Sequence, residues 1–169
     1  MSAATELPEA EATLLALAER MRGAVAHDAA FVGIYSGGAW LAERLPALVP
    51  GNHPVGYIDV SFYRDDYART GLKPNTKRTE LPFDVDGATI VLVDDVLFTG
   101  RSVRAAVNEL FDFGRPARIE LAVLIDRGGR ELPIEPTYCG ARLAVARDLS
   151  IVLSRDDDRL RLAAEKAEG

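Results

Sequence analysis

The chain has 169 residues, of which 48% are apolar and 27% charged, with a formal net charge of −6 at pH 7. This composition is that of an ordinary globular chain, so it excludes fibrous and disordered classes, and the length predicts a single domain over residues 1–169. Apolar runs stay well below the ~20 residues that cross a bilayer, so we expect no membrane partner.

The first third of the chain predicts two helices and two strands. Apolar residues at three- and four-residue steps predict an amphipathic helix over residues 14–25. The apolar run 31–35 predicts a strand that feeds a tight Ser36-Gly37-Gly38 loop, after which residues 39–47 have helical composition. Residues 55–63 predict a second strand.

Residues 64–82 show no periodicity and contain a glycine and two prolines, so we expect a long flexible loop there. Loops of this length without structure of their own are typically lids, binding loops or disordered linkers. Five basic residues against three acidic ones over 64–80 suit a lid over an anionic ligand. A solvated loop with scattered charges is the alternative.

The second half of the chain predicts a strand, a helix and a strand in succession. The β-branched run 88–93 is typical of a strand buried on both faces, and 119–125 is a second such run. Between them we expect a loop over 94–101 and a helix over 102–113. Such a crossover predicts an α/β fold with a central, mostly parallel sheet flanked by helices.

The last part of the chain is less regular. Residues 143–145 and 151–153 predict short late strands, and we expect the charged tail from about residue 155 to be peripheral.

The stretch 91–102, VLVDDVLFTGRS, carries the most chemical information. A strand brings the adjacent carboxylates of Asp94 and Asp95 to its C-terminal end, where open α/β sheets bind ligands. The following turn opens a helix whose N-terminal amides attract anions, and Gly100 allows the main chain to come close. The carboxylates would repel a phosphate, so sugar hydroxyls or a divalent metal are their partners. The string fits a ribose 5-phosphate, whereas the Asp-Asp pair alone fits a solvated turn equally well.

The string VLVDDVLFTGRSVRA resembles the phosphoribosyl pyrophosphate motif of the type I phosphoribosyltransferases. Three further pieces narrow the resemblance to the family of bifunctional pyrimidine-operon regulators and uracil phosphoribosyltransferases: DVSFYRDD at 59–66, FGRPARIELAVLIDRGGRELPI at 113–134, and Tyr138-Cys139-Gly140. The pieces keep the family's order and spacing over most of residues 31–153. The resemblance implies the type I phosphoribosyltransferase fold, with a small hood and a flexible lid loop.

The resemblance also implies a role for individual residues. Asp94 and Asp95, the catalytic pair, would hold the ribose 2′- and 3′-hydroxyls. The 5-phosphate would lie in the turn formed by Val96, Leu97, Phe98, Thr99, Gly100, Arg101 and Ser102. The remaining substrate-binding residues would be Ser36 and Gly37 at pyrophosphate, Arg64 and Asp65 at the start of the lid, Arg127 at the phosphoribosyl group, and Ile151 with its main chain at uracil.

The implied reaction joins uracil to phosphoribosyl pyrophosphate and releases UMP and pyrophosphate. A Mg²⁺ ion bound with phosphoribosyl pyrophosphate would make pyrophosphate a better leaving group, and the two carboxylates would stabilise a cationic sugar. We expect no metal site made by the protein alone, because His27 and His53 lack metal-ligand spacing. The family also suggests a UMP-responsive regulator of pyrimidine biosynthesis genes, and a homodimer or homotetramer.

The sequence departs from the family's pattern at three places, one of which is the first helix, where Ala18 and Arg22 replace polar residues that relatives place on the RNA-facing surface. Ser36-Gly37-Gly38 stands where relatives read Thr-Arg-Gly, which removes a bidentate contact to pyrophosphate. A catalytically weak, nucleotide-sensing regulator is therefore one alternative, and on that hypothesis Gly37→Arg should raise turnover. Gly129 stands where relatives have histidine. A purine phosphoribosyltransferase is the other alternative.

An RNA partner would have to use surface arginines. The candidates are Arg127, Arg130, Arg142 and Arg147. The chain has no basic stretch interleaved with aromatic residues of the kind that stacks unpaired bases, so solvated or ion-paired arginines are the favoured alternative. The single cysteine, Cys139, cannot form an internal disulfide, and the N-terminal segment lacks the pattern of a signal peptide, so we expect a cytoplasmic protein.

Overall fold

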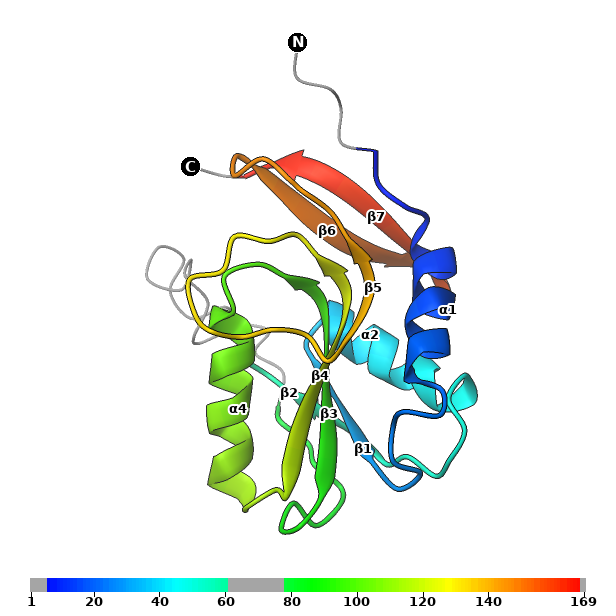
Figure 1. Cartoon of the computed structure of the whole chain (residues 1–169), viewed down its shortest axis with the longest axis vertical. Coiled ribbons are helices and arrows are strands. Elements are labelled where there is room, and N and C mark those ends of the chain that lie inside the picture. Colours follow the sequence, from blue (N-terminus) through cyan, green and yellow to red (C-terminus); the bar gives the residue numbers. More distant parts are fainter. Residues whose placement is uncertain (1–5, 61–77, 168–169) are drawn as a thin grey trace.

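The computed structural model describes residues 6–60 and 78–167. Its centre is a five-stranded sheet in the order β2-β1-β3-β4-β5, and a separate two-stranded sheet is made by β6 and β7 (Figure 1). All neighbouring strands of the central sheet are parallel, which confirms the predicted α/β class. The strands are β1 (Ala30–Ile34), β2 (Val55–Ile58), β3 (Thr89–Leu97), β4 (Arg118–Asp126), β5 (Tyr138–Arg142), β6 (Leu149–Asp156) and β7 (Arg159–Lys166). The helices are α1 (Ala10–Met21), α2 (Gly37–Arg44) with the 3-10 turn Leu45–Ala47, and α4 (Arg101–Phe113).

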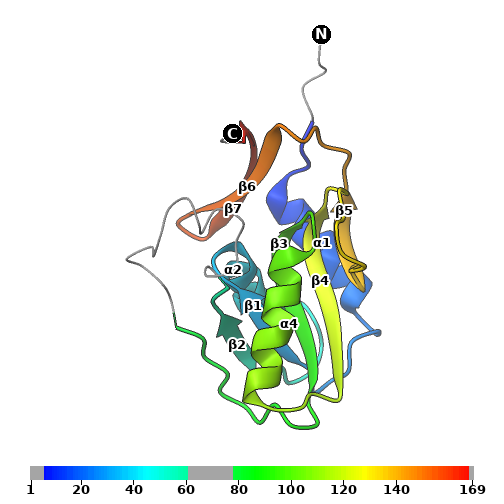
Figure 2. The ribbon, with the colours of Figure 1, turned by 90° about the vertical axis from the view of Figure 1, so that its left-hand side faces the viewer.

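Helices cover both faces of the central sheet, with α1 and α2 on one face and α4 on the other (Figures 1 and 2). Alternate strand residues enter opposite halves of the core, because successive strand side chains point to opposite faces. Phe31 and Val91 pack with α1 and α2, whereas Val32 and Leu92 pack with α4. Burial of each such side chain contributes roughly 1.5–3 kcal/mol to the free energy of unfolding.

The N-terminal helix runs over Ala10–Met21, four residues earlier at each end than the predicted 14–25. Gly23 has a positive φ of 76°, and the amides of Ala24 and Val25 donate hydrogen bonds to the Met21 carbonyl. Val25 is buried from this turn. Because Val25 is a buried apolar residue, the apolar pattern in the sequence continues beyond the end of the helix.

Two other boundaries differ from prediction in ways that shape the site. Gly37 and Gly38, expected in a loop, form the first turn of α2. The expected loop over 94–101 is strand as far as Leu97, because pairing with β4 continues through Val96 and Leu97. Both aspartates therefore lie within β3, although Asp is a poor strand former.

Strand β2 ends at Ile58, so the expected strand over 55–63 is shorter, and residues 61–63 lie outside the described part. Of the expected loop over 64–82, residues 64–77 also lie outside it. Glu80 returns to the sheet, where its amide and carbonyl exchange hydrogen bonds with Tyr57 at 2.9 and 2.8 Å.

The C-terminal region is more ordered than its charge suggests. The expected strand over 143–145 is absent, and β5 precedes it. The tail from about residue 155, expected to be peripheral, instead forms the β6–β7 hairpin. Leu160 is only 2% exposed and joins the core beneath α1. Leu160 and Leu162 alternate with arginines, which is the period-two pattern of a half-buried strand, but this alternation spans only residues 159–162.

The β6–β7 hairpin forms the small hood, on the side of the sheet where the parallel strands end (Figures 1 and 2). Glu11 and Arg44 fix it to the helices. Arg44 donates to both carboxylate oxygens of Glu11, at 2.9 and 3.3 Å, and to the Asp158 carbonyl at 3.3 Å. Glu11 also accepts from the Leu160 amide at 3.2 Å. Within the described ranges, no helix combines the length and apolar character needed to span a membrane.

Candidate active site

The carboxyl ends of β1 and β3 form the centre of the candidate site. These strands are neighbours, yet β1 continues into α2 on one face of the sheet and β3 into α4 on the other (Figure 2). Adjacent strands whose connections leave on opposite faces create a crevice between their ends, and open α/β sheets bind ligands there. The predicted Asp94, Asp95, Ser36 and Gly37 all lie at this point.

The aspartate pair is held by its own main chain. Asp94 is 7% exposed, and its Oδ1 accepts from the Asp95 amide at 2.9 Å. Asp95 is half-buried, and its Oδ1 accepts from the Val96 amide at 2.8 Å. These bonds orient both carboxylates, which leaves Asp95 Oδ2 on the side of α2.

The first turn of α2 packs directly on the aspartates. A Cβ added to Gly37 would lie 2.7 Å from Asp95 Cγ, closer than carbon atoms approach without displacement. One added to Gly38 would lie 3.1 Å from Asp94 Cα. The two glycines therefore let the positive end of a helix reach the carboxylates, with Ser36 exposed at its N-terminus.

The turn between β3 and α4 packs against residues 131–134 and is hydrogen-bonded to them. Gly100 has a φ of 95°, a left-handed conformation that favours glycine, and a Cβ there would lie 3.3 Å from Ile134 Cβ. The Thr99 carbonyl accepts from the amides of Glu131 and Leu132 at 3.0 and 3.2 Å. The Thr99 hydroxyl accepts a hydrogen bond from the Arg101 amide at 3.2 Å.

Gly100, the N-cap residue of α4, has no capping side chain, and the Thr99 side chain engages the Arg101 amide. The amides of Ser102 and Val103 belong to the first helical turn, which lacks carbonyl partners inside the helix. Together with the positive end of the helix dipole, they suit an anion. Of the other residues in the predicted phosphate turn, Leu97 is buried, while Val96 and Phe98 are half-buried.

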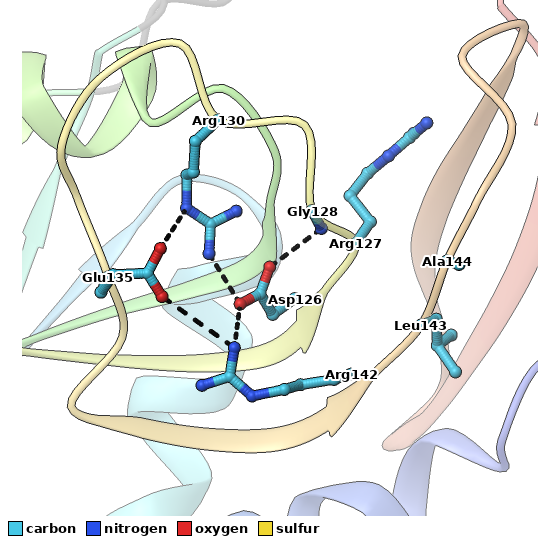
Figure 3. Close-up of a pocket in the computed structure, with 8 residues that line it drawn as sticks. All are labelled: Asp126, Arg127, Gly128, Arg130, Glu135, Arg142, Leu143 and Ala144. Atoms are coloured by element: carbon cyan, nitrogen blue, oxygen red, sulfur yellow. Dashed lines mark hydrogen bonds and ion pairs between the residues drawn. The ribbon is translucent and has the colours of Figure 1, made fainter.

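Asp126, at the end of β4, forms hydrogen bonds that hold the loop following β4. Its carboxylate accepts from Arg130 at 2.6 Å, Arg142 at 2.7 Å and the Gly128 amide at 3.0 Å (Figure 3). Burial by itself raises the pKa of Asp126, but the Arg130 hydrogen bond, the Gly128 amide and the two positive charges outweigh it and lower the pKa. Arg130 also donates to the Phe98 carbonyl at 3.0 Å, which ties this cluster to the turn.

Arg127 is only 6% exposed, and its guanidinium bonds within the protein. It donates to the carbonyls of Leu149 at 2.7 Å and Ala146 at 3.0 Å, and it lies over the Phe98 ring at 4.0 Å from the centroid. Burial lowers the pKa of Arg127. The sequence-based expectation that this side chain reaches the phosphoribosyl group stays a prediction.

Two cavities flank the phosphate turn. One of about 310 Å³ is lined by Phe98, Thr99, Glu131 and Arg147. Another of about 400 Å³ is lined by Asp126, Arg127, Gly128, Arg130, Glu135, Arg142, Leu143 and Ala144 (Figure 3). The aspartate pair lines neither of these two cavities.

The remaining predicted residues are more distant or not described. Ile151 is buried in β6, with its side chain in the core. Arg64 and Asp65 lie outside the described residues. Sequence reasoning did not identify Asp126 as the centre of an arginine cluster. Its signal was a lone acid at the end of a buried strand, followed by three arginines within sixteen residues.

Within residues 6–60 and 78–167, no three His, Cys, Asp or Glu side chains gather as a metal-binding group. The chemistry of the Asp94–Asp95 pair nevertheless fits Mg²⁺, which takes one or two carboxylates together with phosphate oxygens of a substrate.

Comparison with known proteins agrees with this geometry. Residues 5–141 match the phosphoribosyl transferase domain. The chain is 54% identical over 142 residues to the bifunctional protein PyrR of Ralstonia nicotianae, covering 84% of this chain and 81% of that protein. It is 51% identical over 123 residues to the bifunctional protein PyrR of Pseudomonas aeruginosa (strain LESB58), covering 73% of this chain and 72% of that protein.

Solved structures with the same fold include purine enzymes. A hypoxanthine-guanine phosphoribosyltransferase of Bacillus anthracis is 15% identical with a TM-score of 0.67, covering 98% of both chains, a likeness that shows the fold alone. The purine phosphoribosyltransferase of Pyrococcus horikoshii is 27% identical with a TM-score of 0.59, covering 79% of this chain and 81% of that one. The domain match and the high identity to the curated relatives show that this chain belongs to the type I phosphoribosyltransferases and, within them, to the family of the bifunctional PyrR proteins.

Proposed function

We propose that this chain is a uracil phosphoribosyltransferase, forming UMP and pyrophosphate from uracil and phosphoribosyl pyrophosphate, and that UMP at the same site regulates pyrimidine biosynthesis genes. The observation that carries the proposal is the meeting of the Asp94–Asp95 pair with the N-terminal turns of α2 and α4. One pair of acids between two anion-binding helix ends suits a sugar that carries phosphate groups at two positions. The whole of residues 1–169 would act as one cytoplasmic phosphoribosyltransferase domain.

The sugar would be held from both sides. Asp94 and Asp95 accept hydrogen bonds from the ribose 2′- and 3′-hydroxyls, since carboxylates are strong acceptors. The 5-phosphate lies at the N-terminus of α4, where Gly100 keeps the main chain close and the amides of Ser102 and Val103 donate.

Pyrophosphate would lie at the N-terminus of α2. There Gly37 places main-chain amides next to Asp95, and these amides retain a contact to the anion although the family's arginine is missing. Mg²⁺, held by the aspartate pair together with substrate oxygens, would supply charge neutralisation of the departing pyrophosphate. Positive charge on the sugar increases as pyrophosphate departs, so the fixed carboxylates stabilise the transition state more than the ground state.

The base would lie under the hood, where β6 carries Ile151. Main-chain groups near this residue would recognise the edge of uracil, since its side chain is committed to the core. The predicted contacts of Arg64 and Asp65 concern residues outside the described part and stay predictions.

The test is a set of steady-state assays with Mg²⁺, phosphoribosyl pyrophosphate, and uracil, hypoxanthine, guanine or orotate. We expect uracil to give the highest kcat/KM, and a preference for a purine would overturn the assignment. Asp94→Asn with Asp95→Asn removes two charged hydrogen-bond acceptors and should weaken UMP binding, measured by calorimetry, by roughly 10- to 100-fold. Unchanged affinity would reject the site itself.

The presence of Gly37 favours a second candidate, a nucleotide sensor with weak catalysis. Tight UMP binding together with turnover near background would support it over the enzyme. For regulation through RNA, the guanidinium groups of Arg127 and Arg130 are poor candidates because carbonyls and Asp126 already engage them. Arg142, which also donates to Asp126, and Arg147 are the more exposed candidates. Titration of leader RNA with and without UMP, and sedimentation for the proposed dimer or tetramer, test these parts.

A further inference from the structure

Arg127 and Phe98 connect the two halves of the proposed site. Phe98 belongs to the phosphate turn, whereas the carbonyls of Ala146 and Leu149 belong to the turn that opens β6, the strand of the proposed base pocket. We infer that Arg127 is a positioning residue, which fixes β6 relative to the phosphate turn by stacking on Phe98 and donating to these two carbonyls. The inference rests on the proposed function for its consequence in catalysis.

The contacts of Arg127 leave little room for a flexible side chain. Its two terminal nitrogens donate at 2.7 and 3.0 Å to carbonyls three residues apart, which forces the guanidinium plane into one orientation. The plane lies over the Phe98 ring with 4.0 Å between Cζ and the centroid, a favourable cation–π distance. Burial to 6% exposure removes competing water and strengthens each bond.

The Phe98 ring is held as firmly as the guanidinium that lies on it. Gly129 makes this possible, because a Cβ there would lie 2.9 Å from Phe98 Cδ2. The Phe98 carbonyl accepts from Arg130, which Asp126 in turn fixes. Phe98 therefore acts as a rigid platform attached to the phosphate turn.

The link matters because the reaction needs the base at a set distance from the anomeric carbon. Ile151 follows Leu149 by two residues on one strand, so a shift at the Leu149 carbonyl moves the main chain that would contact uracil. A displacement of ~1 Å can cost on the order of 100-fold in rate. Loss of Arg127 should therefore impair use of the base more than binding of the phosphoribosyl group.

The test compares Arg127→Met, Arg127→Lys and Phe98→Leu with Arg20→Met, an exposed arginine on α1 that serves as matched control. We expect Arg127→Met to raise the KM for uracil about tenfold or more, with the KM for phosphoribosyl pyrophosphate changed less than about twofold. Arg127→Lys should recover part of the loss because it can still donate to one carbonyl. The double variant Arg127→Met with Phe98→Leu should lose less kcat/KM for uracil than the product of the two single losses. An equal rise in both KM values, or fully multiplicative effects, would overturn the inference in favour of direct ligand contact.

Amide hydrogen exchange provides a readout that does not need activity. We expect Arg127→Met and Phe98→Leu to accelerate exchange over residues 146–153, while Arg20→Met does not. If the wild-type protein fails to use uracil, the proposed function fails, and the exchange result still decides the positioning link. Unchanged exchange in both variants would reject that link even in an active enzyme.

Discussion

Gly37 lies against Asp95 with no space for a side chain between them: a Cβ at position 37 would lie 2.7 Å from the Asp95 Cγ. Gly37→Ala should therefore push the Asp95 carboxylate away from the Val96 amide, from which it accepts a hydrogen bond of 2.8 Å. We expect kcat/KM to fall at least about tenfold, because misplaced groups lose positioning energy. Assays with phosphoribosyl pyrophosphate and uracil measure the loss.

The same contact reverses an expectation drawn from sequence. On the hypothesis of a catalytically weak regulator, the sequence predicts that Gly37→Arg raises turnover by restoring a guanidinium contact, but any Cβ at this position meets Asp95 first. We now expect a loss with either residue. Gly87→Ala is a suitable control, since a Cβ there meets no atom within 4 Å, although its φ of 73° carries some strain. A gain of turnover in Gly37→Arg would show that the Asp95 carboxylate moves without cost.

The Asp126 cluster predicts unequal contributions from its two arginines. Arg130 is 15% exposed and also holds the Phe98 and Ile134 carbonyls, whereas Arg142 is 63% exposed. Arg130→Met should lower the free energy of unfolding by about 2–4 kcal/mol, because it removes a positive charge that neutralises the buried Asp126 carboxylate. Arg142→Met should cost less than about 1 kcal/mol, as is typical of exposed ion pairs. Urea denaturation measures both, and equal losses would contradict the prediction.

Glu11 predicts a pH-dependent contribution to stability. The hydrogen bond from Arg44 lowers the pKa of Glu11 from 4.5, against an opposing effect of burial and with help from the Leu160 amide. Its stabilisation is therefore present above pH 4.5 and lost as the pH falls through the lowered folded-state pKa. Glu11→Gln should be about 1 kcal/mol less stable near pH 7.

Denaturation of wild type and Glu11→Gln across acidic pH measures this dependence. The difference between the two should narrow below pH 4.5. Glu19→Gln provides the control, because the pair between Glu19 and Arg22 is exposed and 3.7 Å apart. A difference that did not change with pH would contradict the assigned role of the charge.

Tyr138 predicts a late alkaline transition. Burial, the hydrogen bond to Glu120 and the charge of that carboxylate raise its pKa to about 12. The neutral phenol stabilises the fold below pH 10, and this contribution is lost as the pH rises from 10 to about 12. Ultraviolet titration should show one tyrosine ionising near pH 12 that disappears in Tyr138→Phe. Glu120→Gln should shift that transition to lower pH, and an unshifted transition would contradict the assigned partner.

The sequence predicted the position of the aspartate pair beside the phosphate turn better than the contacts that surround them. Asp94, Asp95 and Gly100 are neighbours in the chain, so one strand–turn–helix pattern places them together. Arg127 and Phe98 are far apart in sequence, and their stacking depends on how β4 and the phosphate turn are packed. Local periodicity carries no information about such a pair, and the contact of Arg127 with the phosphoribosyl group, which the family resemblance implies, stays a prediction.

The hood shows the same limit in the fold. Leu160 and Leu162 lie in a segment rich in charge, where a short alternation with arginines is the only strand signal, and the packing of Leu160 against α1 distinguishes the hairpin from a solvated tail. The central strands were easier to identify because their residues are buried on both faces and form continuous apolar runs.

The hydrogen bond from the Leu160 amide to Glu11 joins residues 149 positions apart. During synthesis from the N-terminus, Glu11 on α1 is added 149 residues before Leu160, so α1 emerges well before the strand that completes its covering. Until then Leu17 and its neighbours on α1 lack part of their final apolar contacts, and exposed apolar surface of this kind invites aggregation. A nascent chain from which β7 has not yet emerged would therefore expose part of this face of α1, and the emergence of β7 would allow the face to be covered.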